Sequence, residues 1–346
     1  MEKKKKVLIV RLSAMGDVIF TIPLANALSS AGYEVSWLVS EKGYSLVKNN
    51  PCVDKVILAP IEKWKKSGNP IKNFMEYLSI LKSIRQEKYD IALDTQLILK
   101  SLYWMLFCGA KRRIVAKNYR EMAILGGNEV IDATRVGNEP HAVRSYLKYG
   151  EYLGVGNENN VCVTLPETSS QAKSKVDELL SGIDKTKPVI VAAPATTWVT
   201  KHWNRDNWKE LLSKLKNDYN IILSGTQGDS ELLSYIDDGY FNFCGKTNLE
   251  ELQELLSRAD LVISMDSGTT HLAWATQNPK IVSIFCSTPE SLYAPLGDKS
   301  RYISLSAKNI CPPCHRRKCP KGTNECTNYP RVDDVYNAVI KLLKGE

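Results

Sequence analysis

The sequence lacks any apolar run that approaches the roughly 20 residues needed to span a bilayer as a helix. Its N-terminus, MEKKKKVLIVRLSAMGD, begins with lysines, but Arg11 interrupts the apolar stretch before the core of a signal peptide forms. Hydrophobic residues make up 43% of the 346 positions, which is ample for buried sheets. The chain is therefore predicted to be a globular protein of the cytoplasm.

Several sequence motifs are also missing. No Walker A motif occurs, and no GxGxxG follows the first apolar strand, which argues against a kinase and a classical NAD enzyme. The net charge of +8 favours an anionic partner such as a phosphorylated lipid or a nucleotide. The basic residues are spread along the chain and no Lys/Arg tract is interleaved with a nucleic-acid reading motif, so no nucleic-acid partner is expected.

What the sequence does contain is an almost regular alternation of strand and helix patterns. Strands are expected at residues 6–10, 34–39, 54–58, 89–94, 112–116, 188–193, 220–225, 260–265 and 281–285. Most are short continuous apolar runs, which is typical of parallel strands buried on both faces. One intervening helix starts with a capping-box pattern, Thr247 followed by Glu250. The fold class predicted is α/β, with doubly wound parallel sheets.

The alternation breaks once, in a polar and turn-rich stretch near residues 155–187. Residues 1–165 are predicted to form an N-terminal domain and residues 185–330 a C-terminal one. We expect these domains to face each other across a cleft, with ligands at the carboxyl ends of the strands. The last helix, 331–346, follows a cysteine-rich segment and is expected to cross back onto the N-terminal domain.

Asp17 raises the first chemical question. In VRLSAMGDVIFTIP, residues 10–23, an apolar strand delivers this carboxylate to the first turn of the following helix. A helix cap and a catalytic base are both compatible with that position.

A second strand-end motif is DLVISMDSGTTHLAWA, residues 260–275. The amides at a helix N-terminus beside glycine and hydroxyl residues can bind a phosphate, and Asp266 can hold sugar hydroxyls. An ordinary capped turn is the alternative reading. Thr196, Thr197 and Lys201 follow another buried strand and are expected at the same edge, where a lysine can neutralise a departing diphosphate.

A lysine-rich segment, IEKWKKSGNPIKN, spans residues 61–73 and interrupts the strand–helix pattern. Lys63, Lys65, Lys66 and Lys72 surround Trp64 there. These cations can receive the phosphates of a large acceptor, or they can simply form a solvated charged surface.

Four stretches together resemble glycosyltransferase family 9, the ADP-heptose:lipopolysaccharide heptosyltransferases, in order and spacing: RLSAMGDVIFTIP, ATTWVTKHW, MDSGTTHLAWATQNPKIVSIF and TPESLYAPLG. The segments IEKWKKSGNPIK and KYDIALDTQLILKS are most similar to the heptosyltransferase I branch, which adds the first heptose to Kdo. The resemblance implies a GT-B fold, an inverting reaction and no metal or other cofactor in catalysis. It also implies an ADP-heptose donor, a Kdo-lipid A acceptor, and a place at the cytoplasmic face of the inner membrane.

The resemblance assigns roles residue by residue. Asp17 is the implied base and Lys201 the implied partner of the β-phosphate, while either Asp229 or Glu231 binds the ribose. The implied donor-binding residues are Thr196, Thr197, Asp229, Glu231, Met265, Asp266, Ser267, Gly268, Thr269 and His271. The implied acceptor-binding residues are Ser13, Gly16, Lys63, Lys65, Lys66 and Arg120. Glu62 departs from the pattern, since a basic residue is expected there.

Nine cysteines are present, and four of them, Cys311, Cys314, Cys319 and Cys326, have the spacing C-x2-C-x4-C-x6-C. Four thiolates so close in sequence can bind a structural zinc ion, and disulfides are the alternative. Similar tails occur in many family 9 members but not in heptosyltransferase I, so the tail favours the wider family, including heptosyltransferase II-like enzymes.

Two other functions compete with heptosyl transfer. One is a sugar-nucleotide-binding protein of the same fold without catalysis, which the presence of Asp17 and Lys201 argues against. The other is a GT-B enzyme of another activity, such as an epimerase or a UDP-sugar transferase, and nucleotide preference would separate it from a heptosyltransferase.

Overall fold

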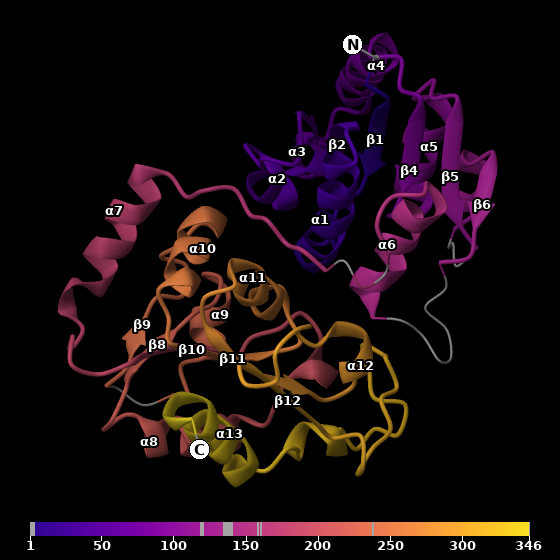
Figure 1. Ribbon diagram of the computed structural model, residues 1–346. Helices are drawn as coiled ribbons and strands as arrows, with labels where there is room; N and C mark the ends of the chain where they lie inside the picture. Colours follow the sequence, from indigo (N-terminus) through magenta and orange to yellow (C-terminus); the bar gives the residue numbers. More distant parts are fainter. Residues whose placement is uncertain are drawn as a thin grey trace. The chain divides into compact units, whose positions relative to one another are not determined.

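The computed structural model describes residues 4–117, 121–133, 141–157, 159, 161–236 and 239–345. The chain divides into two compact units, unit 1 (Met1–Glu167) and unit 2 (Thr168–Glu346), and Figure 1 shows a layer of strands between helices in each. The division falls inside the turn-rich stretch at 155–187 that the sequence marks.

Unit 1 is built on a six-stranded parallel sheet in the order β3-β2-β1-β4-β5-β6. Its strands are β1 (Lys6–Val10), β2 (Glu34–Ser40), β3 (Lys55–Ala59), β4 (Ile91–Asp94), β5 (Arg112–Ala116) and β6 (Glu129–Ile131). The central pair, β1 and β4, is in register at Val10 and Asp94. Both strands are almost completely buried because helices cover both faces of the sheet.

The helices of unit 1 form two groups. They are α1 (Met15–Ser30), α2 (Glu41–Val47), α3 (Ile61–Ser67), α4 (Pro70–Gln86), α5 (Leu99–Phe107), the 3-10 turn η1 (Ala123–Gly126) and α6 (Ala142–Tyr152). Helix α1 contacts α2 and α6, whereas α5 contacts α4 and η1. These two groups lie on opposite faces of the sheet, as right-handed crossovers from a central strand require.

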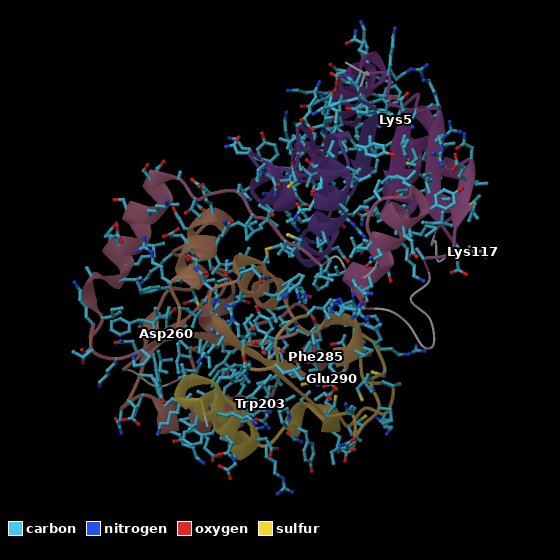
Figure 2. All side chains as sticks on the ribbon, viewed as in Figure 1. Lys5, Lys117, Trp203, Asp260, Phe285 and Glu290 are labelled. Atoms are coloured by element: carbon cyan, nitrogen blue, oxygen red, sulfur yellow. The ribbon has the colours of Figure 1, made fainter. Side chains whose placement is uncertain are left out.

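Unit 2 repeats this architecture with the strand order β12-β11-β10-β7-β8-β9. Its strands are β7 (Val189–Ala193), β8 (Asn220–Leu223), β9 (Phe241–Asn242), β10 (Leu261–Met265), β11 (Lys280–Phe285) and β12 (Tyr302–Ser306). All of them are parallel. Trp203 and Phe285, both labelled in Figure 2, are buried in this unit.

The helices of unit 2 are α7 (Ser170–Leu179), α8 (Arg205–Leu215), α9 (Asp229–Leu232), α10 (Leu249–Ser257), α11 (Gly268–Thr276), α12 (Glu290–Tyr293) and α13 (Val332–Lys344), with 3-10 turns η2 (Leu180–Gly182), η3 (Val199–Lys201) and η4 (Glu325–Asn328). Helix α13 packs on α8, β11 and β12, and its apolar side chains Val335 and Val339 are buried in the core of unit 2. The expected return of this helix to the N-terminal domain stays a prediction.

Some details differ from the sequence-based expectations. The capping box of α10 uses Asn248 and Glu251, one residue later than expected, because the Asn248 side chain accepts from the Glu250 and Glu251 amides. The sequence missed β6, β9 and β12, which lie at sheet edges. Within the described part of the chain, no helix combines the length and apolarity that crossing a membrane would demand.

Candidate functional site

Neighbouring strands of unit 1 hold the β1–α1 loop in place. Gln96 follows β4, and its Oε1 accepts from the backbone amides of Leu12 and Ser13 at 2.9 and 3.0 Å. On the other side, Ser40 at the end of β2 donates its hydroxyl to the Leu12 carbonyl at 2.6 Å. Since Gln96 and Ser40 both bond to Leu12, and Gln96 also bonds to Ser13, the start of α1 is fixed relative to the carboxyl edge of the sheet.

Asp17 lies in the first turn of α1 and is half-buried. The hydroxyl of Tyr146, from α6, donates to Asp17 Oδ1 at 2.9 Å. The N-cap position of α1 is Ala14, which has no side chain capable of capping. The carboxylate is thus held by a hydroxyl from a second helix, and the loop before it is fixed independently.

The guanidinium of Arg11 packs against the face of the Tyr146 ring. Its guanidinium carbon lies 4.6 Å from the centre of the Tyr146 ring, and the side chain is almost completely buried. A cation against an aromatic face in a desolvated place is stabilising, so the ring that carries the hydroxyl is itself positioned.

Asp94 is the second strand-end carboxylate of unit 1, and it is fully buried. Burial raises its pKa to about 6, although hydrogen bonds from the Leu97 amide and the Ser101 hydroxyl and the charge of Arg11 act in the opposite direction. Its two oxygens bond to groups of the β4–α5 loop and of α5, so Asp94 shapes that connection.

The predicted acceptor residues are distributed over this edge of unit 1. Ser13 and Gly16 flank Asp17 in the β1–α1 connection. Lys63, Lys65 and Lys66 lie on α3, which follows the carboxyl end of β3, and all three are exposed. Two of them have ion-pair partners, since Lys63 contacts Glu76 at 2.8 Å and Lys65 contacts Glu62 at 2.7 Å. Arg120 lies outside the described residues.

In unit 2 the N-terminus of α11 lacks a side-chain cap. Ser267 occupies the N-cap position with extended backbone angles, and no side-chain hydrogen bond caps the helix. Its hydroxyl oxygen is buried and has no hydrogen-bond partner among the described residues. The first amides of α11 therefore have no side-chain cap, and an uncapped helix N-terminus can bind a phosphate.

Asp266 precedes this helix, and its carboxylate has three side-chain partners. Its Oδ2 contacts Lys201 Nζ at 2.6 Å and accepts from the Thr288 hydroxyl at 2.6 Å, while Oδ1 lies 3.5 Å from His271 Nε2. Burial raises the pKa of Asp266, but the hydrogen bond from His271 and the charge of Lys201 outweigh it and hold the pKa well below its usual range. The carboxylate is therefore ionised and charge-compensated.

Lys201 reaches Asp266 from the turn η3. Its ammonium lies 4.7 Å from the centre of the Trp198 ring, and its side chain is only 15% exposed. Thr196 donates its hydroxyl to the Asp266 carbonyl at 3.4 Å, and its own carbonyl lies 2.8 Å from His202 Nε2. The structure thus brings together the two strand-end segments that the sequence placed at one edge.

Comparison with known proteins agrees with this geometry. The family model for glycosyltransferase family 9 (heptosyltransferase) matches residues 77–324, well over half of the chain. The chain belongs to glycosyltransferase family 9. It is similar to lipopolysaccharide heptosyltransferase 1 of Escherichia coli (strain K12), with 27% identity over 88% of this chain and 95% of that protein.

Two solved structures show the fold. The family 9 glycosyltransferase of Veillonella parvula DSM 2008 matches with a TM-score of 0.83 and 21% identity, over 100% of this chain and 99% of that one. An Escherichia coli heptosyltransferase with ADP-2-deoxy-2-fluoro heptose matches with a TM-score of 0.68 and 22% identity, over 98% and 99%. The α/β fold of this family 9 glycosyltransferase is therefore GT-B, as the sequence predicted.

The structure also describes the surroundings of three other residues that the family resemblance assigned to donor binding. Met265 is fully buried in the apolar core of unit 2, and its carbonyl accepts from the Thr270 hydroxyl. Asp229 Oδ2 accepts from the amide and the hydroxyl of Thr226, both at 2.7 Å, within its own turn. Thr197 is exposed. The Glu231 side chain lies outside what the structure describes.

Tyr146 and Thr288 are the residues of these two sites that sequence reasoning missed. Thr288 belongs to the quoted stretch TPESLYAPLG, which carried a family resemblance but no role for this hydroxyl. Tyr146 lies 129 positions after Asp17, in a helix without a motif. Thr288 could have been found from the sequence, because it lies in a stretch that resembles the family. No sequence feature pointed to Tyr146.

The four cysteines of the tail line one cavity of about 180 Å³, together with Thr200 and Ser287. All four are free thiols. Backbone hydrogen bonds, the one from Asn324 first, hold the pKa of Cys319 below its ordinary value. Among the described residues, no three His, Cys, Asp or Glu side chains are close enough to hold one ion. The thiols therefore share a cavity but are not arranged as a ligand set.

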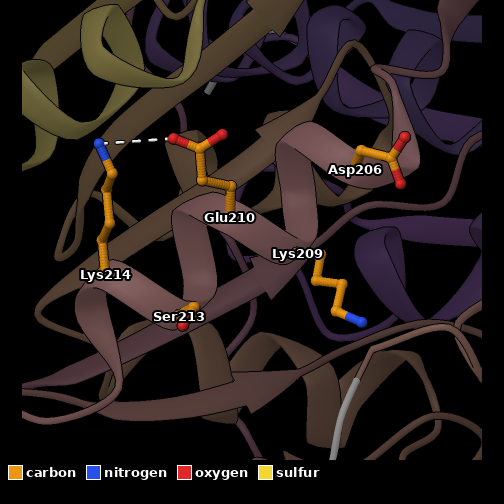
Figure 3. Close-up of a pocket in the computed structure, with 5 residues that line it drawn as sticks. All are labelled: Asp206, Lys209, Glu210, Ser213 and Lys214. Carbon is orange, nitrogen blue, oxygen red and sulfur yellow. Dashed lines mark ion pairs between the residues drawn. The ribbon is translucent and has the colours of Figure 1, made fainter.

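Figure 3 shows a larger pocket of about 410 Å³ elsewhere in unit 2. Its lining residues all belong to α8: Asp206, Lys209, Glu210, Ser213 and Lys214. Because a single helix forms its wall, it is an open surface depression. Lys214 pairs with Glu210 at 3.5 Å and with Asp333, which lies outside the pocket, at 2.6 Å. The pocket contains none of the residues that the family resemblance selected.

Proposed function

We propose that this family 9 glycosyltransferase moves heptose from ADP-heptose to the Kdo of the lipopolysaccharide inner core, with inversion at the anomeric carbon. One observation carries the proposal: Lys201 and Asp266 are paired at 2.6 Å beside the uncapped N-terminus of α11. A diphosphate fits a helix N-terminus with a buried lysine, and a sugar fits a carboxylate next to it. The names of the relatives support the choice of heptose and of lipopolysaccharide.

In the proposed reaction, Asp17 takes the proton of the acceptor hydroxyl as that oxygen attacks the anomeric carbon. The bond from this carbon to the β-phosphate breaks, and ADP leaves with the electron pair. Asp17 must come within about 3 Å of the hydroxyl for this step. Lys201 and the amides of α11 offset the charge that develops on the phosphate, which is electrostatic stabilisation by groups already in place.

The proposed acceptor contacts are ionic. Lys66 makes no ion pair within 4 Å among the described residues, whereas Lys63 and Lys65 would have to exchange glutamate partners for phosphates. Exposed ion pairs contribute about 0–1 kcal/mol each, so this exchange costs little. We place the enzyme in the cytoplasm, at the inner face of the inner membrane, where such an acceptor is embedded.

The test is incubation with ADP-heptose and Kdo-lipid A, followed by mass spectrometry for one added heptose. Asp17→Ala is expected to lose transfer by about 10²–10⁴-fold while it still binds ADP, because a general base supplies that much. The Lys214→Met variant, altered in an exposed pair of the same unit, is the control and should transfer normally. Transfer of another sugar, or Asp17→Ala turnover equal to wild type, would contradict the proposal.

We also propose that the cysteine segment holds a structural zinc ion. Four free thiols around one cavity, one of them with backbone hydrogen bonds that favour its thiolate, support this assignment. Zinc would have to draw the sulfur atoms together from their present positions. Elemental analysis of the purified protein should find one zinc per chain, and none in Cys314→Ser/Cys319→Ser. Metal-free wild type in which all four thiols of this segment can be alkylated would refute it.

A further inference from the structure

Helix α4 of unit 1 presents its apolar stripe to solvent. Ile71, Phe74, Met75 and Leu78 recur at helical spacing, so they share one side of the helix, and they are 76%, 58%, 61% and 39% exposed. The buried residues of α4, Leu81 and Ile84, come later in the helix, towards its C-terminal end. Exposed apolar side chains that recur along one helix face mark an interaction site.

Helix α5 continues this exposed surface. Tyr103 and Phe107, one turn apart, are 50% and 46% exposed. The two helices are neighbours, since the Tyr77 hydroxyl of α4 donates to the Tyr103 carbonyl at 3.3 Å and the Tyr77 ring lies 4.6 Å from the Trp104 ring. We call the exposed apolar residues of α4 and α5 the α4–α5 face.

Cations accompany the α4–α5 face. Helices α3, α4 and α5 together carry seven lysine or arginine residues and two glutamates. Both glutamates pair with α3 lysines. Lys72, Lys82 and Lys100 are exposed and make no ion pair within 4 Å among the described residues. The surface therefore combines apolar side chains with an excess of unneutralised positive charge.

We infer that the α4–α5 face binds the surface of an anionic bilayer. Helices that lie in a membrane interface combine large apolar side chains with lysine and arginine on the flanks, as α4 does. Lysine is depleted in protein–protein interfaces, so the charge favours lipid over a second copy of the chain. Aromatic residues such as Phe74 and Tyr103 are typical of the interfacial layer.

The position of the α4–α5 face suits a lipid-anchored acceptor, and this step rests on the proposed function. Helix α5 follows the carboxyl end of β4, whose neighbour β1 delivers Asp17 at the same edge of the sheet. The stacked rings of Trp64 and Trp104 join α3 and its lysines to α5. An acceptor sugar on a bilayer bound to this face would thus meet the lysines and Asp17 within one unit.

The binding test is co-sedimentation with phosphatidylglycerol-containing vesicles and with neutral phosphatidylcholine vesicles. Wild type should bind the anionic vesicles only, and 0.5 M salt should release it, because about 1 kcal/mol per lysine is screened within a Debye length. Phe74→Ser/Met75→Ser should lower binding about tenfold or more. The control Val130→Ser/Ile310→Ser removes two exposed apolar side chains, 44% and 43% exposed, outside the face and should bind as wild type.

The remaining outcomes separate the alternatives. Equal binding of Phe74→Ser/Met75→Ser and wild type would overturn the inference. The inference would also be overturned if wild type formed a dimer that does not bind vesicles and the variant were a monomer. The variant should transfer heptose normally to a water-soluble, deacylated acceptor but poorly to one in vesicles. If wild type transfers to neither acceptor, the proposed function fails, and vesicle binding still tests the face.

Discussion

Two lysine–aspartate pairs of unit 2 have the same separation and opposite surroundings. Lys201 Nζ and Asp266 Oδ2 are 2.6 Å apart, with side chains 15% and 4% exposed. Lys214 Nζ and Asp333 Oδ1 are also 2.6 Å apart, with side chains 37% and 76% exposed. Because distance and residue types match, removing the lysine from each pair compares the loss of a buried ion pair with the loss of an exposed one.

Lys201→Met leaves the buried Asp266 carboxylate without its cation. Breaking a buried pair from one side costs about 3–5 kcal/mol, because the remaining charge stays desolvated. With a urea dependence of about 2 kcal/mol per molar, the unfolding midpoint of unit 2 should fall by about 2 M. Lys214→Met should leave the midpoint unchanged within error, since water screens that pair. Urea unfolding followed by tryptophan fluorescence measures both.

The pH dependence of this loss gives a second check. The folded-state pKa of Asp266 is depressed, so its stabilisation is present above the unfolded pKa of about 3.9 and is lost only as pH falls through the folded value. In Lys201→Met the buried carboxylate loses its cation, and protonation relieves the unpaired charge. The deficit relative to wild type should therefore shrink between pH 7 and pH 4. Equal losses in the two lysine variants, or a deficit independent of pH, would refute the reasoning.

Three further predictions follow from single contacts. Tyr146→Phe should lower kcat about 10- to 100-fold at unchanged ADP affinity, since a hydrogen bond to a carboxylate contributes about 1.5–3 kcal/mol. The control is Tyr149→Phe, which loses a hydroxyl that donates to the Asp94 carbonyl. This control should lower stability but not kcat. Ser267→Ala should keep its unfolding free energy but weaken ADP binding about fivefold by calorimetry, since one hydrogen bond contributes about 1 kcal/mol. Asp94 has a folded-state pKa raised to about 6, so wild-type unit 1 should lose about 2 kcal/mol of stability as pH rises from 4 to 7, and Asp94→Asn should not.

The sequence was most informative where burial is complete. Each of its nine expected strands is present, because a strand buried on both faces leaves a continuous apolar run. The three missed strands are short or only partly buried; β9 has two residues, and every residue of β12 is partly exposed. An edge strand has one neighbour and partial exposure, so its composition resembles that of a loop.

For the site, sequence reasoning located the residues that follow buried strands and missed their partners. Lys201 and Asp266 each come soon after a strand end, and parallel strands bring such positions to one edge. Tyr146 meets Asp17 only because α6 packs on α1, a contact that no local pattern encodes. The same limit applies to α13, whose amphipathic pattern requires a covering sheet but does not specify which one.

The three strand-end carboxylates differ in what surrounds them, and this difference supports the proposed division of labour. A general base must receive a proton during the reaction. Asp266 is ill suited, because Lys201 and His271 stabilise its ionised form. Asp94 takes up a proton more readily, but it is fully buried and bonded to its own loop, where no substrate hydroxyl reaches it. Asp17 alone of the three is partly exposed, and the Tyr146 hydroxyl donates to its Oδ1 at 2.9 Å, which orients the carboxylate. The proton of the acceptor is therefore best placed on Asp17, and Asp266 is left to hold the sugar.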